Sequence, residues 1–200
     1  MSKFKSFLTA ILLLCLASPA IPQTPVIISK VTDSIVQTKW IDDEDNGMFC
    51  TGFVVGITWV ITAKHCIPPD GKYADITING KPSKIIRSNE AFALLEIQPN
   101  EYPMLQLRKD SPKIGEPVTS FGFPYGFNTL MAFKRNVAGY CECNFAKGDH
   151  LVLDGRIGSG MSGGPVIDVN GRVVGLNQAG VDTISITCTV DEIEKFLKGK

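Results

Sequence analysis

Histidine and net charge are both scarce in this sequence. Only two of the 200 residues are histidine, at positions 65 and 150, and 20 Lys and Arg balance 20 Asp and Glu to a formal net charge of zero. A neutral chain lacks the basic surface that attracts nucleic acid or an anionic membrane, so neither is expected as a partner. Chemistry that needs an imidazole has only two candidate residues.

The sequence also lacks an apolar run that would comfortably cross a bilayer. The stretch at residues 7–17 is shorter than the roughly 20 residues that a spanning helix needs. Two lysines precede it and the small residues of Ser18-Pro19-Ala20 follow it, an order typical of a secretory signal. We expect residues 1–20 to be a signal peptide, and the mature chain to be secreted or periplasmic without stable membrane association. An uncleaved N-terminal anchor is the alternative.

The sequence also lacks internal repeats and low-complexity runs, and we expect no additional binding domain. With 44% hydrophobic and 20% charged residues, the composition is that of an ordinary globular protein. Short runs rich in Val, Ile, Thr and Phe alternate with Gly, Pro, Asn and Asp, a pattern typical of an all-β sandwich or barrel. Only residues 191–198 are expected to form a helix, with Ile193 and Phe196 on one face and Asp191 as its cap.

The most informative stretch is residues 158–166, which read Gly-Ser-Gly-Met-Ser-Gly-Gly-Pro-Val. Glycine reaches positive φ and proline fixes φ, so this composition predicts a tight turn that enters a strand. With Ser162 at the apex, the N–H groups of Gly160 and Ser162 can converge on one point, the geometry that stabilises an oxyanion. A Gly/Ser-rich surface turn without chemistry is the alternative.

A serine hydroxyl needs a neighbouring base to act as a nucleophile. His65 follows the apolar run Trp59-Val60-Ile61-Thr62-Ala63 and precedes Cys66, so a predicted strand would present its imidazole. His150 lies in a polar context, Lys-Gly-Asp-His, and is expected to be a surface residue. His65 is therefore the candidate general base for Ser162.

The motifs Trp-Val-Ile-Thr-Ala-x-His-Cys around His65 and Gly-x-Ser-Gly-Gly-Pro around Ser162 together resemble the chymotrypsin-like (trypsin-like) serine protease family. Residues 115–126 resemble the start of the second barrel in compact bacterial members of that family. The resemblance covers residues 21–200 and implies an all-β fold with two six-stranded antiparallel β-barrels, the active site in the cleft between them and a short C-terminal helix. The implied parts are a first barrel at about 26–101, a linker at about 102–114, a second barrel at about 115–190 and the helix at 191–198.

The resemblance implies a serine endopeptidase that cleaves peptides or proteins through an acyl-enzyme on Ser162, with His65 as general base and without cofactor or metal. It also implies a Cys50–Cys66 disulfide beside His65. Residues that would line the substrate backbone and specificity pocket are Asn177, Ala179 and Gly180. Arg156, six residues before Ser162, would either approach the pocket floor or be a solvated turn residue.

One expected residue is missing. Family members carry an aspartate that orients the histidine at the start of an Asp-Leu-Ala-Leu-Leu run, and here the run begins at Ala91. Three explanations stay open: Glu90 substitutes through a β-bulge, Asp75 or a water orients the ring in a Ser-His dyad, or the chain is a pseudoprotease that acts as a binding protein. Loss of this carboxylate lowers turnover by about 10⁴ in the well-studied triad.

The remaining cysteines of the mature chain are Cys141, Cys143 and Cys188. Cys141 and Cys143 would face the same side of a strand, so either could pair with Cys188. A Cys-x-Cys metal site is the rival interpretation, and no nearby histidine or cysteine completes its ligand set in the sequence.

Overall fold

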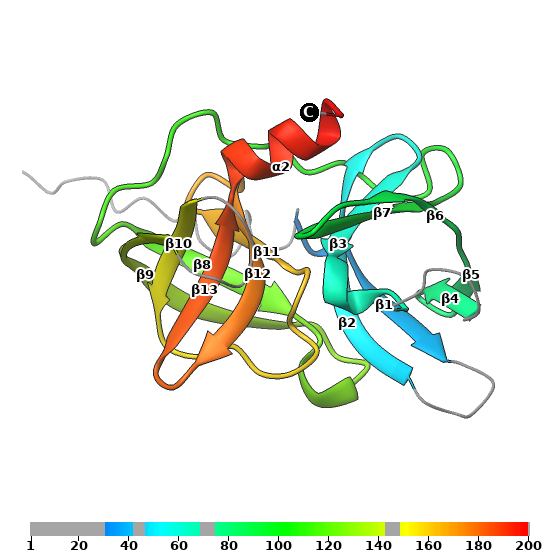
Figure 1. Ribbon diagram of the computed structural model, residues 1–200, viewed down its shortest axis with the longest axis horizontal. Helices are drawn as coiled ribbons and strands as arrows, with labels where there is room; N and C mark the ends of the chain where they lie inside the picture. Colours follow the sequence, from blue (N-terminus) through cyan, green and yellow to red (C-terminus); the bar gives the residue numbers. More distant parts are fainter. Residues whose placement is uncertain (1–30, 42–46, 69–74, 143–148, 200) are drawn as a thin grey trace, which may run out of the picture.

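The structure, a computed structural model, describes residues 31–41, 47–68, 75–142 and 149–199. It consists of two antiparallel β units placed side by side, with one α-helix near the C-terminus lying across the top of both (Figure 1). None of the helices in the described ranges is long and apolar enough to cross a membrane. The expected signal peptide lies outside these ranges.

The first unit is a seven-stranded sheet with the strand order β5-β4-β1-β2-β3-β7-β6. Its strands are β1 (Ile35–Ile41), β2 (Gly47–Gly56), β3 (Trp59–Ala63), β4 (Asp75–Ile78), β5 (Lys81–Pro82), β6 (Ile85–Ser88) and β7 (Phe92–Glu96). The central strands β3 and β7 are buried along most of their length, as expected for runs of Val, Ile, Leu and Phe covered on both faces. They carry the segment that holds His65.

The second unit is a closed six-stranded barrel with the order β10-β13-β12-β11-β8-β9. Its strands are β8 (Pro117–Gly122), β9 (Met131–Glu142), β10 (Asp149–Asp154), β11 (Pro165–Asp168), β12 (Val173–Val181) and β13 (Ile184–Thr189). Its apolar filling includes Val118, Val137, Leu151, Leu153 and Val166. The predicted turn at residues 158–164 connects β10 to β11 at the end of the barrel nearest the first sheet (Figure 1).

The all-β prediction is confirmed, and the second barrel has the expected six strands. The first unit differs in detail, because it has seven strands and its edge strands β5 and β6 are not paired with each other. The reason is local: β5 is only two residues long, and its Pro82 has no N–H to donate to a neighbouring strand. The first unit is therefore a curved sheet rather than a closed barrel.

One apolar cluster runs across the seam between the two units. It contains Ala63, Cys66 and Ala91 from the first unit and Phe121 and Leu176 from the second. Burial of shared apolar surface is the main force that holds such units together. A backbone hydrogen bond, Thr51 N–H to Ser162 O at 2.9 Å, also crosses the seam. The seam thereby brings the His65 and Ser162 segments together.

The helix α2 (Val190–Leu197) closes the second barrel and reaches the first sheet. The Phe196 ring packs on Phe92 with ring centroids 5.4 Å apart. Arg87 of β6 donates from Nη2 to Phe196 O at 2.5 Å and Leu197 O at 2.7 Å, which satisfies carbonyls at the negative end of the helix dipole. The N-cap is Thr189, and the predicted cap Asp191 lies in the first turn instead.

Candidate active site

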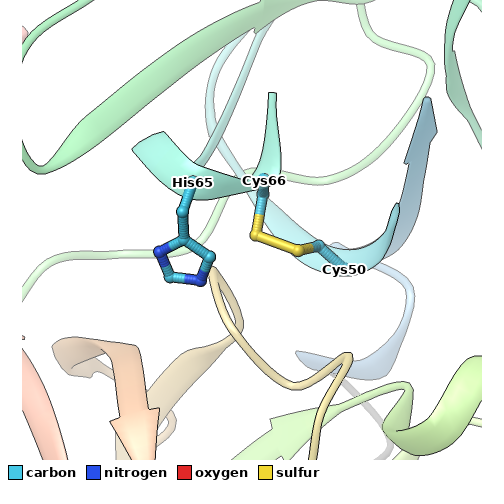
Figure 2. A group of neighbouring side chains, drawn as sticks. All are labelled: Cys50, His65 and Cys66. Atoms are coloured by element: carbon cyan, nitrogen blue, oxygen red, sulfur yellow. A yellow bond between two sulfur atoms is a disulfide. The ribbon is translucent and has the colours of Figure 1, made fainter. Parts of the chain in front are cut away.

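His65 lies in a short 3-10 helix, η1 (Lys64–Cys66), directly after β3. The expected Cys50–Cys66 disulfide is present, with Cα atoms 5.9 Å apart, and it ties β2 to η1 (Figure 2). The imidazole projects from η1 beside the disulfide. Because the bridge fixes the residue next to His65, it restricts where the ring can lie.

The pKa of His65 lies below its ordinary value of 6.5, because burial of much of the side chain disfavours the imidazolium. By solvent-accessible area, however, His65 is an exposed residue. A carboxylate next to the ring would shift the pKa upward, and among the described residues no such group contributes. The environment thus favours the neutral, basic form of His65.

His65, Cys50 and Cys66 have potential ligand atoms within 4.8 Å of one another. Zinc and similar ions require cysteine as the thiolate. Both sulfurs here belong to a disulfide, so they have no thiolate to offer. This group does not fit a metal ion.

The turn that carries Ser162 depends on two glycines with positive φ, Gly160 at +89° and Gly163 at +83°. A Cβ on Gly160 would lie 2.4 Å from Phe123 O, and one on Gly163 would lie 2.1 Å from Thr51 O. These distances are too short for any side chain. The glycines therefore allow the turn to press against both units.

Two peptide groups of this turn are oriented by hydrogen bonds to their carbonyls. Ser159 O accepts from Tyr125 N–H at 2.7 Å, and Met161 O accepts from Gly164 N–H at 3.0 Å. In a trans peptide the N–H points opposite to the C=O, so the N–H groups of Gly160 and Ser162 point away from these contacts. Neither N–H donates to another group of the described residues. Two N–H groups of the turn are therefore available as donors, which is one requirement of an oxyanion hole.

Thr51 is a contributor that the sequence did not reveal. Its Oγ1 donates to Gly160 O at 2.8 Å and accepts from Phe123 N–H at 2.9 Å, and the residue is fully buried. A buried threonine on a strand carries no motif of its own. Only the fold shows that it anchors the Ser162 turn to β2.

Ser162 itself is half-buried, and its hydroxyl donates to Gln178 O on β12 at 3.3 Å. The Ser162 carbonyl oxygen lies 3.6 Å from Cys66 Sγ, the sulfur of the residue next to His65. The structure therefore brings the two predicted residues, His65 and Ser162, to the same part of the seam. In this structure the Ser162 hydroxyl points toward the backbone carbonyl of Gln178.

Ala91 lies at the position where an orienting carboxylate was expected. Its carbonyl accepts from Lys64 N–H at 2.8 Å, which continues the pairing of β7 with β3 up to the residue before His65. That pairing has no register shift, so the bulge on which a role for Glu90 depends is absent there. Glu90 is exposed. The strand of Asp75, β4, is separated from β3 by β1 and β2 in the sheet.

The expected substrate-binding residues differ in exposure. Ala179 and Gly180 are half-buried, whereas Asn177 is fully buried and donates from Nδ2 to Phe121 O at 3.2 Å. A Cβ on Gly180 would lie 2.7 Å from Arg156 Cγ. The exposed Arg156 side chain therefore packs against β12 at Gly180, beside the predicted substrate strand.

His150 corrects a sequence-based expectation. It is 1% exposed rather than a surface residue, because β10 places it between Cys141 of β9 and Cys188 of β13. Two strand spacings, about 9.5 Å, separate those cysteines, which is beyond the about 7 Å limit between Cα atoms of a disulfide. A Cys141–Cys188 bridge is thus excluded in this register, and Cys143 lies outside the described residues.

Two β units with a histidine segment and a serine turn at their seam form a trypsin-like arrangement. A comparison of the sequence with known families leads to the same class. Residues 50–176 match the family model described as the trypsin-like peptidase domain. The chain therefore belongs to the trypsin-like peptidase family.

Similar proteins include probable periplasmic serine endoproteases described as DegP-like. The one from Hahella chejuensis is 35% identical over 99 residues, which is 48% of this chain and 21% of that protein. The one from Bartonella henselae is 28% identical over 139 residues, 66% of this chain and 28% of that protein. This chain thus spans only about a fifth to a quarter of their length.

Among solved structures, the Rv3671c protease from M. tuberculosis in its active form superposes with a TM-score of 0.77 at 22% identity. The match covers 90% of this chain and 86% of that one. The HtrA-type protease AlgW with a tripeptide has a TM-score of 0.75 at 16% identity, covering 89% and 63% of the two chains. At these identities the likeness establishes the fold.

Proposed function

We propose that this protein is a serine endopeptidase in which Ser162 is the nucleophile and His65 the general base. His65 removes the Ser162 hydroxyl proton as Oγ attacks the peptide carbonyl, and then gives that proton to the leaving amine. Water hydrolyses the resulting ester by the same steps. The N–H groups of Gly160 and Ser162 hold the oxyanion, each contributing about 3 kcal/mol to the transition state.

The observation that carries this proposal is the orientation of the Ser162 turn. The carbonyls of Ser159 and Met161 accept from the N–H groups of Tyr125 and Gly164, so the N–H groups of Gly160 and Ser162 point away from those contacts. Gly160 and Gly163 adopt the positive φ that this turn requires, and the turn leaves both donors available. The periplasmic proteases among its relatives support peptide or protein substrates and a periplasmic or secreted location.

A catalytically silent binding protein is the second candidate function. Ala91 favours it, because alanine provides neither the hydrogen bond nor the charge of the usual carboxylate. The two candidates make different chemical predictions, since only an enzyme with an activated serine reacts rapidly with a fluorophosphonate.

The test is the rate at which a fluorophosphonate labels residues 21–200, with the adduct mapped by mass spectrometry. We expect labelling at Ser162 that is lost in Ser162→Ala and His65→Ala. Ser88→Ala is the matched control, because Ser88 is an exposed serine on β6, outside the Ser162 turn. The Ala91→Asp variant should label faster, by up to about 10⁴-fold.

The outcomes separate the two functions. Absence of labelling in the unaltered chain together with labelling of Ala91→Asp identifies a disabled protease and supports the binding protein. Absence of labelling in both contradicts the assignment of the site.

A further inference from the structure

Gln178 contains a buried polar atom that the proposed mechanism has not yet used. The residue is 6% exposed, and its side-chain oxygen Oε1 is buried with no hydrogen-bond partner in the described part of the chain. Buried polar atoms are nearly always paired, so an unpaired acceptor requires an explanation. A catalytic role is one such explanation.

The position of Gln178 connects it to the nucleophile. Its backbone carbonyl accepts the Ser162 hydroxyl at 3.3 Å, and the preceding carbonyl, Asn177 O, accepts from Gly163 N–H at 2.8 Å. Gln178 also lies where the pairing of β12 with β13 shifts register. Bulges of this kind re-aim side chains, often next to active sites.

The neighbours of Gln178 place its strand beside the seam. The Asn177 amide is directed into the second barrel, where it bonds to Phe121 O. Leu176, two residues before Gln178, packs in the seam cluster with Ala63 and Ala91. Strand β12 also contacts β3, the strand that leads to His65. Gln178 thus lies on a strand that borders the seam.

The imidazole on this seam needs an acceptor. Among the described residues, no group makes a hydrogen bond to the His65 ring. The position of the usual carboxylate is taken by the methyl group of Ala91. The nearby Asn89 cannot help, because its Oδ1 already accepts from Ala91 N–H and Phe92 N–H at 2.9 and 2.8 Å.

We propose that Gln178 is the positioning residue for His65, with its Oε1 accepting a hydrogen bond from the Nδ1–H of the imidazole. This inference rests on the proposed function. The bond selects the tautomer in which Nε2 carries the lone pair that takes the Ser162 proton. An amide oxygen orients the ring as a carboxylate does, but it adds no negative charge to stabilise the imidazolium. Gln178 therefore supplies part of what the missing aspartate would supply.

Two substitutions at Gln178 test this role. Gln178→Met keeps the length of the side chain and removes the acceptor, so fluorophosphonate labelling of Ser162 should slow by at least about tenfold. Gln178→Glu restores a carboxylate, so it should label at least as fast as the unaltered chain. In the Gln178→Glu variant, the pH at which labelling declines on the acid side should be higher, because a negative charge favours the imidazolium. The same two changes at the exposed Gln98 are the matched control and should change neither quantity.

A second readout does not depend on reactivity. The chain has two histidines, so ¹⁵N-histidine NMR gives two ring systems, and a His65→Gln variant identifies the signal of His65. We expect the Nδ1-protonated tautomer of His65 in the unaltered chain and a loss of that tautomer in Gln178→Met. Thermal melts establish that each variant is folded.

The inference is overturned if Gln178→Met is folded and leaves three quantities unchanged: the His65 tautomer, the rate of Ser162 labelling, and the pH at which that labelling declines. The two proposals fail separately. If the unaltered chain is not labelled, but Gln178→Met shifts the His65 tautomer, the peptidase proposal fails and the role of Gln178 stands. If the chain is labelled and Gln178→Met changes nothing, only the role of Gln178 fails.

Discussion

At the scale of single residues, the properties of His65 follow from what surrounds it. Burial lowers its pKa, and the usual carboxylate that would raise it is replaced by Ala91. The ring is thereby kept neutral over a wider pH range than in a complete triad. For the same reason, the imidazolium that forms when His65 takes a proton is less stable than it would be beside a carboxylate.

This environment predicts the acid limb of the pH profile. Only neutral His65 can accept the Ser162 proton, and its lowered pKa means that protonation occurs below pH 6.5. Ser162 labelling should therefore persist as the pH falls through 6.5 and decline only below it. The measurement is the fluorophosphonate rate as a function of pH. A midpoint above 6.5 would show that a negative charge lies next to the ring.

The residues that could be predicted were those with a motif. His65, Ser162 and Gly160 are recognisable from their neighbours in sequence, and so is the cysteine pair. The contact of Thr51 with the Ser162 turn and the role that we propose for Gln178 could not be predicted, because both depend on how distant strands are arranged in the fold. His150 was misjudged for the same reason: a polar local sequence says little about a residue that two neighbouring strands cover.

At the scale of elements, the turn of residues 158–164 is shaped by contacts with both units. It is anchored by Thr51 from β2, and its carbonyls are held by neighbouring N–H groups. The sequence predicted the turn from its glycines. It could not predict that positive φ and close packing coincide at Gly160 and Gly163.

We expect Gly160→Ala to damage both the fold and the site. The new Cβ would meet Phe123 O at 2.4 Å, and an L-residue at φ +89° is strained, so the free energy of unfolding should fall by about 1–3 kcal/mol. Labelling of Ser162 should fall as well. Gly139→Ala is the control, because a Cβ there meets nothing within 4 Å. Equal urea midpoints for the two variants would contradict the turn as described.

At the scale of the whole molecule, the two units are joined by more than apolar contact. Arg87 from the first sheet binds the last carbonyls of α2, and its guanidinium lies 4.9 Å from the centroid of the Phe196 ring. The all-β class and the terminal helix could be predicted from the sequence pattern, and the pair of β units from the resemblance to the chymotrypsin-like family. The contact of Arg87 with α2 could not be predicted, because it joins residues more than a hundred positions apart in the sequence.

Replacing Arg87 by Met retains an apolar stem and removes the donors. Two helix carbonyls then lose their charged partner, so the free energy of unfolding should fall by about 1–2 kcal/mol. Urea unfolding of residues 21–200 measures this loss. Lys84→Met, at an exposed position just before β6, should change stability by less than about 0.5 kcal/mol. An Arg87→Met variant as stable as the unaltered chain would mean that apolar packing alone holds the helix.

The unclosed first sheet has a consequence for how copies of this protein meet. Open sheet edges offer N–H and C=O groups to strands of other molecules, a common route to aggregation. Here one edge is β5, two residues long and ending in Pro82, and the other is β6, whose pairing shifts register between Ile85 and Arg87. A short strand with proline and a register shift each make a sheet edge less suitable for pairing with another strand. Both features disfavour the addition of a strand from a second molecule at these two edges.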